Sequence, residues 1–212
     1  VGSGKHSGQF ALEAKEIQAL PSVGGEPDLM KSLQFLPGVQ SGNEGTNNIS
    51  VRGSNQWGNL VLLDEAVVYN PSHVLSFFSV FNNDAIREVN LYKSFFPLKY
   101  GGRSSSVIDV RMREGNSKER ERSASLGLIA SKVLLEGPLK KKEGSYLVSG
   151  RFGYPGVVAG LLGSNLTSKP QMWFYDVNAK VNRTLDARNR MFFSLYSGGD
   201  HTAVSYTHLT LP

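Results

Sequence analysis

The sequence predicts a mixed α+β unit in its first half, followed by a series of antiparallel β-strands. In the first half, short apolar runs alternate with turns and with one segment of helical periodicity. In the second half, polar and apolar residues alternate with a period of two over long stretches. The composition agrees with this fold class, because 23 glycines and 19% charged residues favour turns and strands.

A short helix is expected from about Asp28 to Phe35. Leucines recur in this segment at helical spacing, and Pro27 precedes it. Pro37 and Gly38 then follow, and this pair is typical of the end of a helix. The helix is therefore bounded on both sides.

Four buried strands are expected after the helix, with turns rich in Gly and Asn between them. They cover residues 49–53, 60–64, 86–93 and 107–112. Within residues 86–93 we expect strict alternation between two faces. The helix and the strands together predict one compact α+β unit that ends near Gly115.

The strands of the second half are longer and more regular. The alternation is clearest from Trp173 to Val181, and residues 146–152 and 190–196 follow the same pattern. A run of about nine alternating residues is roughly the length that a tilted strand needs to cross a bilayer. A soluble β-sandwich uses the same alternation, so periodicity alone leaves both architectures open.

The formal charge of +5 does not predict nucleic-acid binding, because the basic residues are scattered among acidic ones. Residues 118–122 alternate in sign and are expected to form a solvated linker. The one dense basic cluster, at residues 140–142, lies between turn-forming residues and predicts the tip of a hairpin.

We expect no catalytic residue, no metal site and no cofactor. The chain has no cysteine, which excludes disulfides and thiolate ligands. Its four histidines are far apart and lack the spacing of metal ligands. The segment from Gly38 to Gly42 has a serine between glycines, but it lacks the spacing and the strand-turn-helix context of a nucleophile elbow.

The two ends of the sequence are unusual. The chain begins at Val1 without an initiator methionine or a signal peptide, and no apolar run approaches the roughly 20 residues of a spanning helix. An internal piece of a longer exported protein is therefore expected. Residues 203–212 resemble the translated end of a truncated reading frame and are expected to be non-native.

Several linked motifs resemble the plug domain of TonB-dependent outer-membrane receptors in their order and spacing. The resemblance covers about residues 17–115, and residues 122–200 resemble the first strands of the surrounding barrel. The motifs are Leu36-Pro37-Gly38-Val39, Ile49-Ser50-Val51-Arg52-Gly53, Leu62-Leu63-Asp64-Glu65-Ala66-Val67-Val68-Tyr69-Asn70-Pro71, Ile86-Arg87-Glu88-Val89, Leu91-Tyr92-Lys93, Tyr100-Gly101-Gly102-Arg103 and Ser106-Val107-Ile108-Asp109-Val110. The resemblance implies an α+β plug domain followed by antiparallel strands of an incomplete transmembrane β-barrel.

The resemblance also implies a domain organisation. We expect a flexible connection at 1–16, a plug domain at 17–115, a charged linker at 116–122, the first strands of the barrel at 123–202, and the suspected non-native tail at 203–212.

Two arginines are candidates for contacts between plug and barrel. In the family, a plug arginine in the position of Arg52 is thought to pair with acidic residues of the barrel wall, and a guanidinium can pair with a carboxylate through two hydrogen bonds. A salt bridge inside the plug is the alternative. Arg103 could face the barrel as well, although a solvated turn is its commoner environment.

Other residues of the motifs are expected to have structural roles. Gly53 follows Arg52 at the end of its strand. Gly101 and Gly102 are expected to form a tight turn with a positive φ. Asp64 is expected to cap the end of an apolar strand by accepting backbone hydrogen bonds.

The function that the resemblance implies is active uptake of a large or scarce nutrient through the outer membrane of the cell, with the plug gating the pore. The expected partners are the TonB complex, bound through a segment upstream, the membrane lipid, and an unknown ligand such as a siderophore, cobalamin, a glycan or a peptide. A surface lipoprotein is a further partner that the resemblance admits. The alternative is a non-transporting β-rich surface module that binds carbohydrate or protein.

Overall fold

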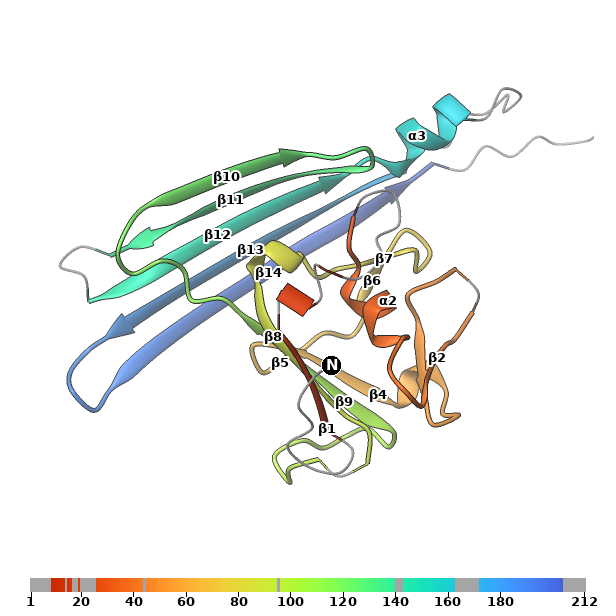
Figure 1. Cartoon of the computed structure of the whole chain (residues 1–212), viewed down its shortest axis with the longest axis horizontal. Coiled ribbons are helices and arrows are strands. Elements are labelled where there is room, and N and C mark those ends of the chain that lie inside the picture. Colours follow the sequence, from red (N-terminus) through yellow and green to blue (C-terminus); the bar gives the residue numbers. More distant parts are fainter. Residues whose placement is uncertain are drawn as a thin grey trace, which may run out of the picture.

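The computed structural model describes residues 9–13, 15–16, 19, 26–43, 45–94, 96–139, 143–162 and 172–203. In chain order its elements are β1 (Gln9–Glu13), α2 (Leu29–Leu33), β2 (Val39–Ser41), β3 (Ile49–Val51), η1 (Gln56–Gly58), β4 (Asn59–Leu63), β5 (Ala66–Val67), β6 (Ser72–His73), β7 (Phe78–Ser79), η2 (Asn83–Ala85), β8 (Ile86–Tyr92), β9 (Ser106–Met112), β10 (Glu121–Leu126), β11 (Ala130–Pro138), β12 (Gly144–Gly153), α3 (Pro155–Leu162), β13 (Met172–Thr184) and β14 (Arg190–Thr202). Figure 1 shows the elements up to β9 as a compact N-terminal unit beside a sheet of long strands.

The N-terminal unit is built on a five-stranded sheet with the order β1-β8-β9-β4-β5. The β4 and β9 strands are parallel, whereas the other neighbours are antiparallel. Apolar residues of β8 and β9, such as Leu91 and Ile108, are fully buried beside Leu29 and Leu33 of α2. The mixed α+β unit predicted for the first half is confirmed, and its four expected strands are present as β3, β4, β8 and β9.

The helix α2 is shorter than the sequence predicts. It covers Leu29–Leu33, because Pro37 and Gly38, whose φ is +76°, end the helical path early. Asp28 caps its start by accepting a hydrogen bond from the backbone N–H of Lys31 at 3.1 Å. The second carboxylate oxygen of Asp28 accepts from the backbone of Ser79 at 2.6 Å, so the cap also holds β7.

The strict alternation expected for residues 86–93 is interrupted. A register shift between Ile86 and Glu88 inserts one residue opposite β9. Ile86, Val89 and Leu91 therefore all point into the core, although the period-two pattern assigns Ile86 to the other face.

Residues 9–13 form β1, although they belong to the segment 1–16 that was expected to be a flexible connection. The β1 strand pairs antiparallel with β8 and buries Leu12 in the core. Phe10 receives the Lys93 ammonium over its ring at 3.9 Å. These contacts are long-range, and the Gly- and Ser-rich sequence upstream of β1 does not indicate them.

The long sheet consists of β10, β11, β12, β13 and β14, each antiparallel to the next along the chain. Its inward face, which lies against the N-terminal unit, is polar and buried. The buried residues there include Arg151, Asp176, Asn178 and Lys180. Its outward face is apolar and open to the surroundings.

The outward face confirms the alternation predicted for the second half. Phe152, Trp173, Tyr175 and Val177 are between 37% and 47% exposed. In a soluble sandwich the apolar face would be the buried one. Here the polar face is buried and the apolar face is exposed, which is the arrangement of a barrel wall in lipid.

The two parts are joined through Gly115. Its φ is +85°, and a Cβ at this position would lie 2.3 Å from the backbone oxygen of Tyr146. The chain can therefore pass β12 closely on its way to β10. The expected hairpin tip at residues 140–142 and the suspected tail from residue 204 onwards lie outside the described residues.

No helix in the described part of the chain is both long enough and apolar enough to cross a membrane.

Candidate functional site

The candidate site is the seam, defined as the contact between the N-terminal unit and the inward face of the long sheet. Its most deeply buried charged group is Asp176 of β13. Asp176 accepts from Arg151 of β12 at 2.8 Å and from the hydroxyl of Tyr196 at 2.9 Å. Its Oδ1 also lies 2.6 Å from Nε2 of His73, which comes from the N-terminal unit. One carboxylate therefore joins three elements.

His73 lies between two carboxylates of the long sheet. Its Nδ1 is 2.8 Å from Asp200 of β14, while its Nε2 contacts Asp176. The imidazole stacks on Phe174 with a centroid distance of 4.7 Å. The ring is thus fixed by hydrogen bonds at its edge and by an aromatic face.

The loop that presents His73 has an uncommon backbone. Val74, Leu75 and Ser76 have φ values of 47°, 53° and 70°, in the left-handed region that β-branched residues rarely adopt. Two long-range hydrogen bonds hold the loop: the backbone N–H of Val74 donates to Asp200 at 3.3 Å, and that of Asn47 donates to the carbonyl of Ser76 at 2.7 Å.

Arg151 extends the ionic contacts toward the start of the N-terminal unit. Its guanidinium donates to the backbone carbonyl of Ser79 at 2.5 Å and lies 3.5 Å from Glu26. Glu26 also contacts Lys132 of β11 at 2.8 Å. Glu26 on one side of the seam and Arg151 on the other are both buried, so the loss of either side chain would leave the other charge buried with fewer partners.

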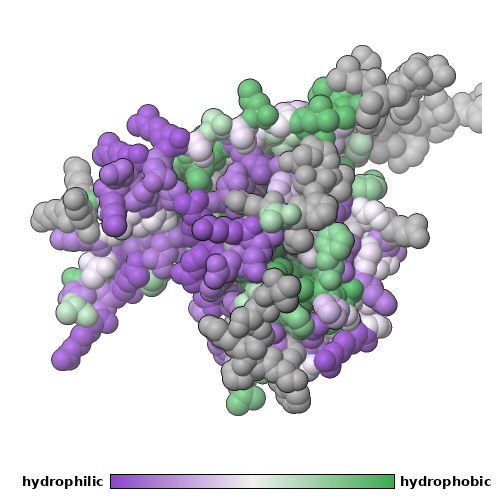
Figure 2. All heavy atoms as spheres, in the orientation of Figure 1, coloured by the Kyte–Doolittle hydropathy of each residue, from purple (hydrophilic) through white to green (hydrophobic). Residues whose placement is uncertain are grey.

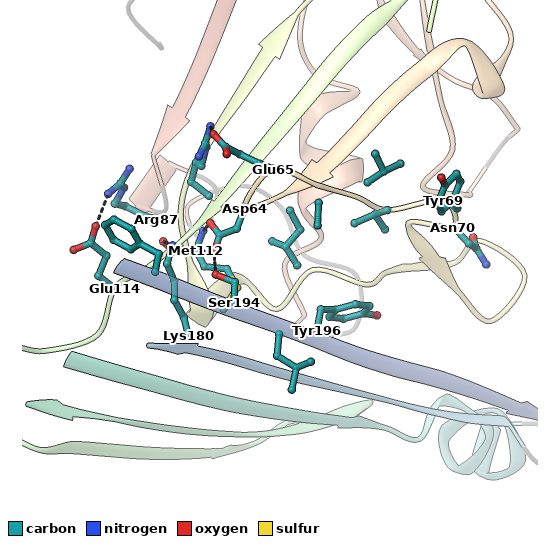
Figure 3. Close-up of a pocket in the computed structure, with 17 residues that line it drawn as sticks. Asp64, Glu65, Tyr69, Asn70, Arg87, Met112, Glu114, Lys180, Ser194 and Tyr196 are labelled. Carbon is teal, nitrogen blue, oxygen red and sulfur yellow. Dashed lines mark hydrogen bonds and ion pairs between the residues drawn. The ribbon is translucent and has the colours of Figure 1, made fainter. Parts of the chain in front are cut away.

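Asp64 forms the middle of the seam. One carboxylate oxygen accepts from the backbone N–H of Met112 of β9 at 3.0 Å, a long-range bond to the neighbouring strand and not to the turn that follows Asp64. The other oxygen contacts Lys180 of β13 at 2.9 Å and Ser194 of β14 at 2.6 Å. Figure 3 shows Asp64 between Met112 on one side and these two residues on the other. Asp64 therefore contacts the long sheet as well as β9.

The end of the seam near the β13–β14 turn is also polar. The backbone carbonyl of Glu114 accepts from Ser145 at 2.7 Å and from Asn182 at 2.9 Å. Its carboxylate lies 2.6 Å from the guanidinium of Arg190. These contacts fix the segment that leaves β9 for the long sheet.

A cleft of about 880 Å³ opens beside the seam, between β5 and the strands β13 and β14. Its charged lining comes from both sides, with Asp64, Arg87 and Glu114 facing Lys180. Figure 3 shows Tyr69 and Asn70 at the other end of this cleft. A polar space therefore runs alongside the contacts that close the seam.

Two apolar residues of the long sheet complete the seam. Leu134 of β11 and Leu147 of β12 point inward and belong to the same buried cluster as the core of the N-terminal unit. Leu147 is fully buried. The buried ring of Phe174 adds a further apolar contact, because it stacks on Phe78 of the N-terminal unit at 5.4 Å as well as on His73.

The two arginines selected from the sequence lie elsewhere. Arg52, with a φ of 54°, and Arg103 are exposed, and Arg103 donates to the carbonyl of Gly102 at 3.0 Å. Within the described residues, neither guanidinium contacts the long sheet. In Figure 1 the start of β4, next to both arginines in the fold, lies away from that sheet. Their docking role remains a prediction that concerns strands beyond β14.

The structural glycines have defined conformations. Gly53 and Gly102 have φ values of 75° and 84°, so both occupy the left-handed region that favours glycine. Gly101 does not have a positive φ, and the expected turn uses Gly102 alone for this purpose.

The seam residues that the sequence missed fall into two groups. Arg151, Asp176 and Lys180 belong to the polar faces of alternating strands, and this pattern could have identified them as inward-facing. His73 lies in a loop without periodicity, and its partner Asp200 is 127 positions away in the chain. Sequence spacing gave no signal for this pair.

The described residues contain no cluster of three or more acidic or histidine side chains with the geometry of a metal site.

Comparison with known proteins decides the family. A family model, the TonB-dependent receptor plug domain, matches residues 11–108. This part of the chain is a plug domain of the TonB-dependent receptor family. From here on, the N-terminal unit is called the plug and the long sheet the wall. No curated protein matches the chain.

Solved structures of outer-membrane receptors share the fold. The siderophore receptor PirA from Pseudomonas aeruginosa is 15% identical, with a TM-score of 0.63, over 93% of this chain and 36% of its own. The outer-membrane transporter YddB from Escherichia coli is 17% identical, with a TM-score of 0.64, over 92% of this chain and 33% of its own. The copper transporter OprC is 14% identical, with a TM-score of 0.64, over 95% of this chain and 31% of its own. The chain thus spans about a third of these structures.

These findings confirm the fold class and the cell location predicted from the sequence. The plug family and the matched structures place the chain in the outer membrane. The apolar outward face of the wall agrees with this location.

Proposed function

We propose that this chain supplies the plug and part of the wall of a receptor for active nutrient uptake, in which the plug gates the pore. The observation that supports this proposal most directly is the seam. Its buried charged groups on the wall contact the plug: Asp176 lies 2.6 Å from the imidazole of His73, and Lys180 lies 2.9 Å from Asp64. The plug closes the wall by ionic contacts that can be exchanged for water.

The geometry fits gating better than permanent attachment. Replacing ion pairs by apolar residues of similar volume often leaves a permanent contact equally stable or more stable. Four of the five buried inward residues of β13 are polar, and two of these four, Asp176 and Lys180, are charged. The apolar contacts of the wall with the plug are made by Leu134, Leu147 and Phe174. A contact of this composition can open without exposing a large apolar surface.

The alternative function, a secreted β-rich binding module, is less compatible with the wall. Such a module must place its polar residues toward water. Here Trp173, Tyr175 and Val177 face outward while Asp176 and Asn178 are buried. We also propose that the chain has no enzymatic activity, in line with the transport receptors that it matches.

The transported ligand is proposed by class alone. The matched structures are those of a siderophore receptor, an outer-membrane transporter and a copper transporter. We therefore propose a metal chelate as the first class to test, with cobalamin, glycans and peptides as further candidates. We further propose that a segment upstream of this chain engages TonB to supply the energy.

A reversible cross-link tests the gating proposal. The chain contains no cysteine, so the double variant Asp64→Cys/Ser194→Cys would introduce one defined pair where the two side chains meet at 2.6 Å. In the full receptor, oxidation should abolish energy-dependent uptake across a panel of labelled ferric chelates, and reduction should restore it. Each single variant is the matched control and should respond to neither treatment.

A second experiment needs no ligand. Deleting residues 11–112 from the full receptor should open the pore and raise the influx of the chromogenic cephalosporin nitrocefin, with or without TonB. Normal uptake by the oxidised double variant, or unchanged influx after deletion, would contradict the proposal.

A further inference from the structure

The helix α3 has a composition that is unusual for a connection between two strands. Its sequence, Pro-Gly-Val-Val-Ala-Gly-Leu-Leu, contains no charged side chain and no side chain that forms hydrogen bonds. A helix that is apolar on all sides is normally buried in a protein core or in a membrane. With eight residues it is far shorter than the roughly 20 residues of a spanning helix.

The helix is not buried in the core of this protein. Val157, in its first turn, is 59% exposed. Figure 1 shows α3 beyond the end of β12, on the side of the wall away from the plug. The exposed apolar side chain of Val157 would therefore be more stable in an apolar environment than in water.

The surface next to α3 is the outward face of the wall. At this end of the sheet it carries a row of rings in contact with one another. Phe152 lies 6.3 Å from Tyr154 and 5.8 Å from Trp173, and Trp173 stacks on His201 at 5.0 Å. Tyrosine and tryptophan concentrate where the hydrocarbon of a membrane meets water. Because α3 begins directly after Tyr154, it begins at this boundary.

The opposite end of the wall differs. The turn between β13 and β14 contains Asp186 and Arg188, both exposed and charged. Figure 2 shows hydrophilic residues at that end and a group of hydrophobic residues at the end that carries α3. The apolar character of α3 is therefore specific to one rim of the wall.

We propose that α3 lies in the surface of the membrane, at the depth of the ring cluster, with lipid acyl chains around Val157. This site goes beyond the proposed transport function, because it anchors the β12–β13 connection to lipid. Lipid is the occupant, since α3 continues the apolar outward face of Phe152, Trp173 and Tyr175, which already faces the membrane.

Site-directed spin labelling tests this proposal directly. Because the chain has no cysteine, Val157→Cys in the full receptor introduces a single label within this chain. The receptor is reconstituted in vesicles of phosphatidylethanolamine and phosphatidylglycerol. We expect collisions of the label with oxygen, which concentrates in lipid, to exceed collisions with a water-soluble nickel complex at least several-fold.

Two further labels calibrate the result. Val177→Cys on the outward face of β13 marks lipid, and Ala187→Cys in the charged β13–β14 turn marks water. The ratio of oxygen collisions to nickel collisions at position 157 should resemble the ratio at position 177. A label at 157 that resembles position 187 would overturn the proposal, as would a label shielded from both reagents, which would indicate that receptor loops cover α3.

A second variant covers the case in which the label prevents folding. When brominated phospholipids replace part of the vesicle lipid, the Val157→Trp receptor should lose more tryptophan fluorescence than the wild-type receptor, because it has one additional tryptophan in contact with lipid. The absence of additional quenching would contradict the lipid position of α3.

Discussion

Asp176→Asn tests whether charge holds the plug against the wall. The substitution keeps the size of the side chain but removes its charge, so the buried guanidinium of Arg151 loses its main partner. The asparagine amide must also turn its NH₂ group either toward Arg151, which donates hydrogen bonds, or toward His73 and Tyr196. With its oxygen on Arg151, the amide turns its NH₂ group toward His73 and Tyr196, which must then both accept hydrogen bonds.

The expected cost follows from the burial of the pair. Removing one partner of a buried ion pair typically costs about 3–5 kcal/mol. Arg151 keeps its contacts with Glu26 and with the carbonyl of Ser79. We therefore expect the lower limit of about 3 kcal/mol, which corresponds to roughly a 100-fold change in the ratio of closed to open seam.

Hydrogen exchange of the full receptor in lipid vesicles measures this ratio. The peptide that contains residues 72–79 should lose about 100-fold of its protection at Val74, because this amide donates its hydrogen bond to Asp200 across the seam. Asp186→Asn, in the exposed turn of the wall, is the control and should leave that peptide unchanged. Equal protection in wild type and Asp176→Asn would refute the ionic account of the seam.

Four other predictions concern the plug and its contacts. Residues 17–115 should resist limited proteolysis as one unit, with early cutting near 115–122, and early cutting within 49–110 would argue against an independent plug. Arg52→Ala should raise nitrocefin leak through the full receptor while leaving the urea midpoint of the isolated plug unchanged; a large drop in that midpoint would place its partner inside the plug. Leu147→Ala should weaken the seam by about 2–5 kcal/mol in the same exchange experiment, because it leaves a cavity in the shared core, whereas Leu135→Ala on the outward face should have little effect. Burial and the hydrogen bond to Asp109 raise the pKa of Tyr100 to about 12. The stabilisation of the plug by neutral Tyr100 is therefore complete below about pH 10 and is lost as the pH rises toward 12. Tyr100→Phe should reduce this alkaline loss of stability, measured by urea unfolding of the plug.

The strands were predictable because their residues obey local periodicity. Alternation in β12, β13 and β14 identified both faces of the wall from the sequence. Periodicity alone did not decide which face is buried, since a soluble sandwich and a membrane wall use the same pattern with opposite environments. The resemblance to the plug motifs made that decision, and the burial of Asp176 agrees with it.

The seam was less predictable, because its partners are distant in sequence. His73 precedes three residues with left-handed backbone, and Asp64 combines a contact to Met112 of β9 with a contact to Lys180 of β13. The register shift near Ile86 arises from the pairing of β8 with β9, and the alternation of polar and apolar residues within β8 does not predict it. Local pattern therefore identified the polar faces, and tertiary pairing determined which of their residues meet the plug.

The inverted polarity of the wall has a consequence for repeated use of the receptor. When an apolar contact opens in water, both surfaces tend to adhere to other apolar surfaces before they close again. Separation of His73 from Asp176 and Asp200, or of Asp64 from Lys180, instead exposes groups that water hydrates well. Under the proposed gating, opening the seam would therefore bring mainly hydratable groups into water, and the apolar surface exposed would come from the contacts around Leu134 and Leu147.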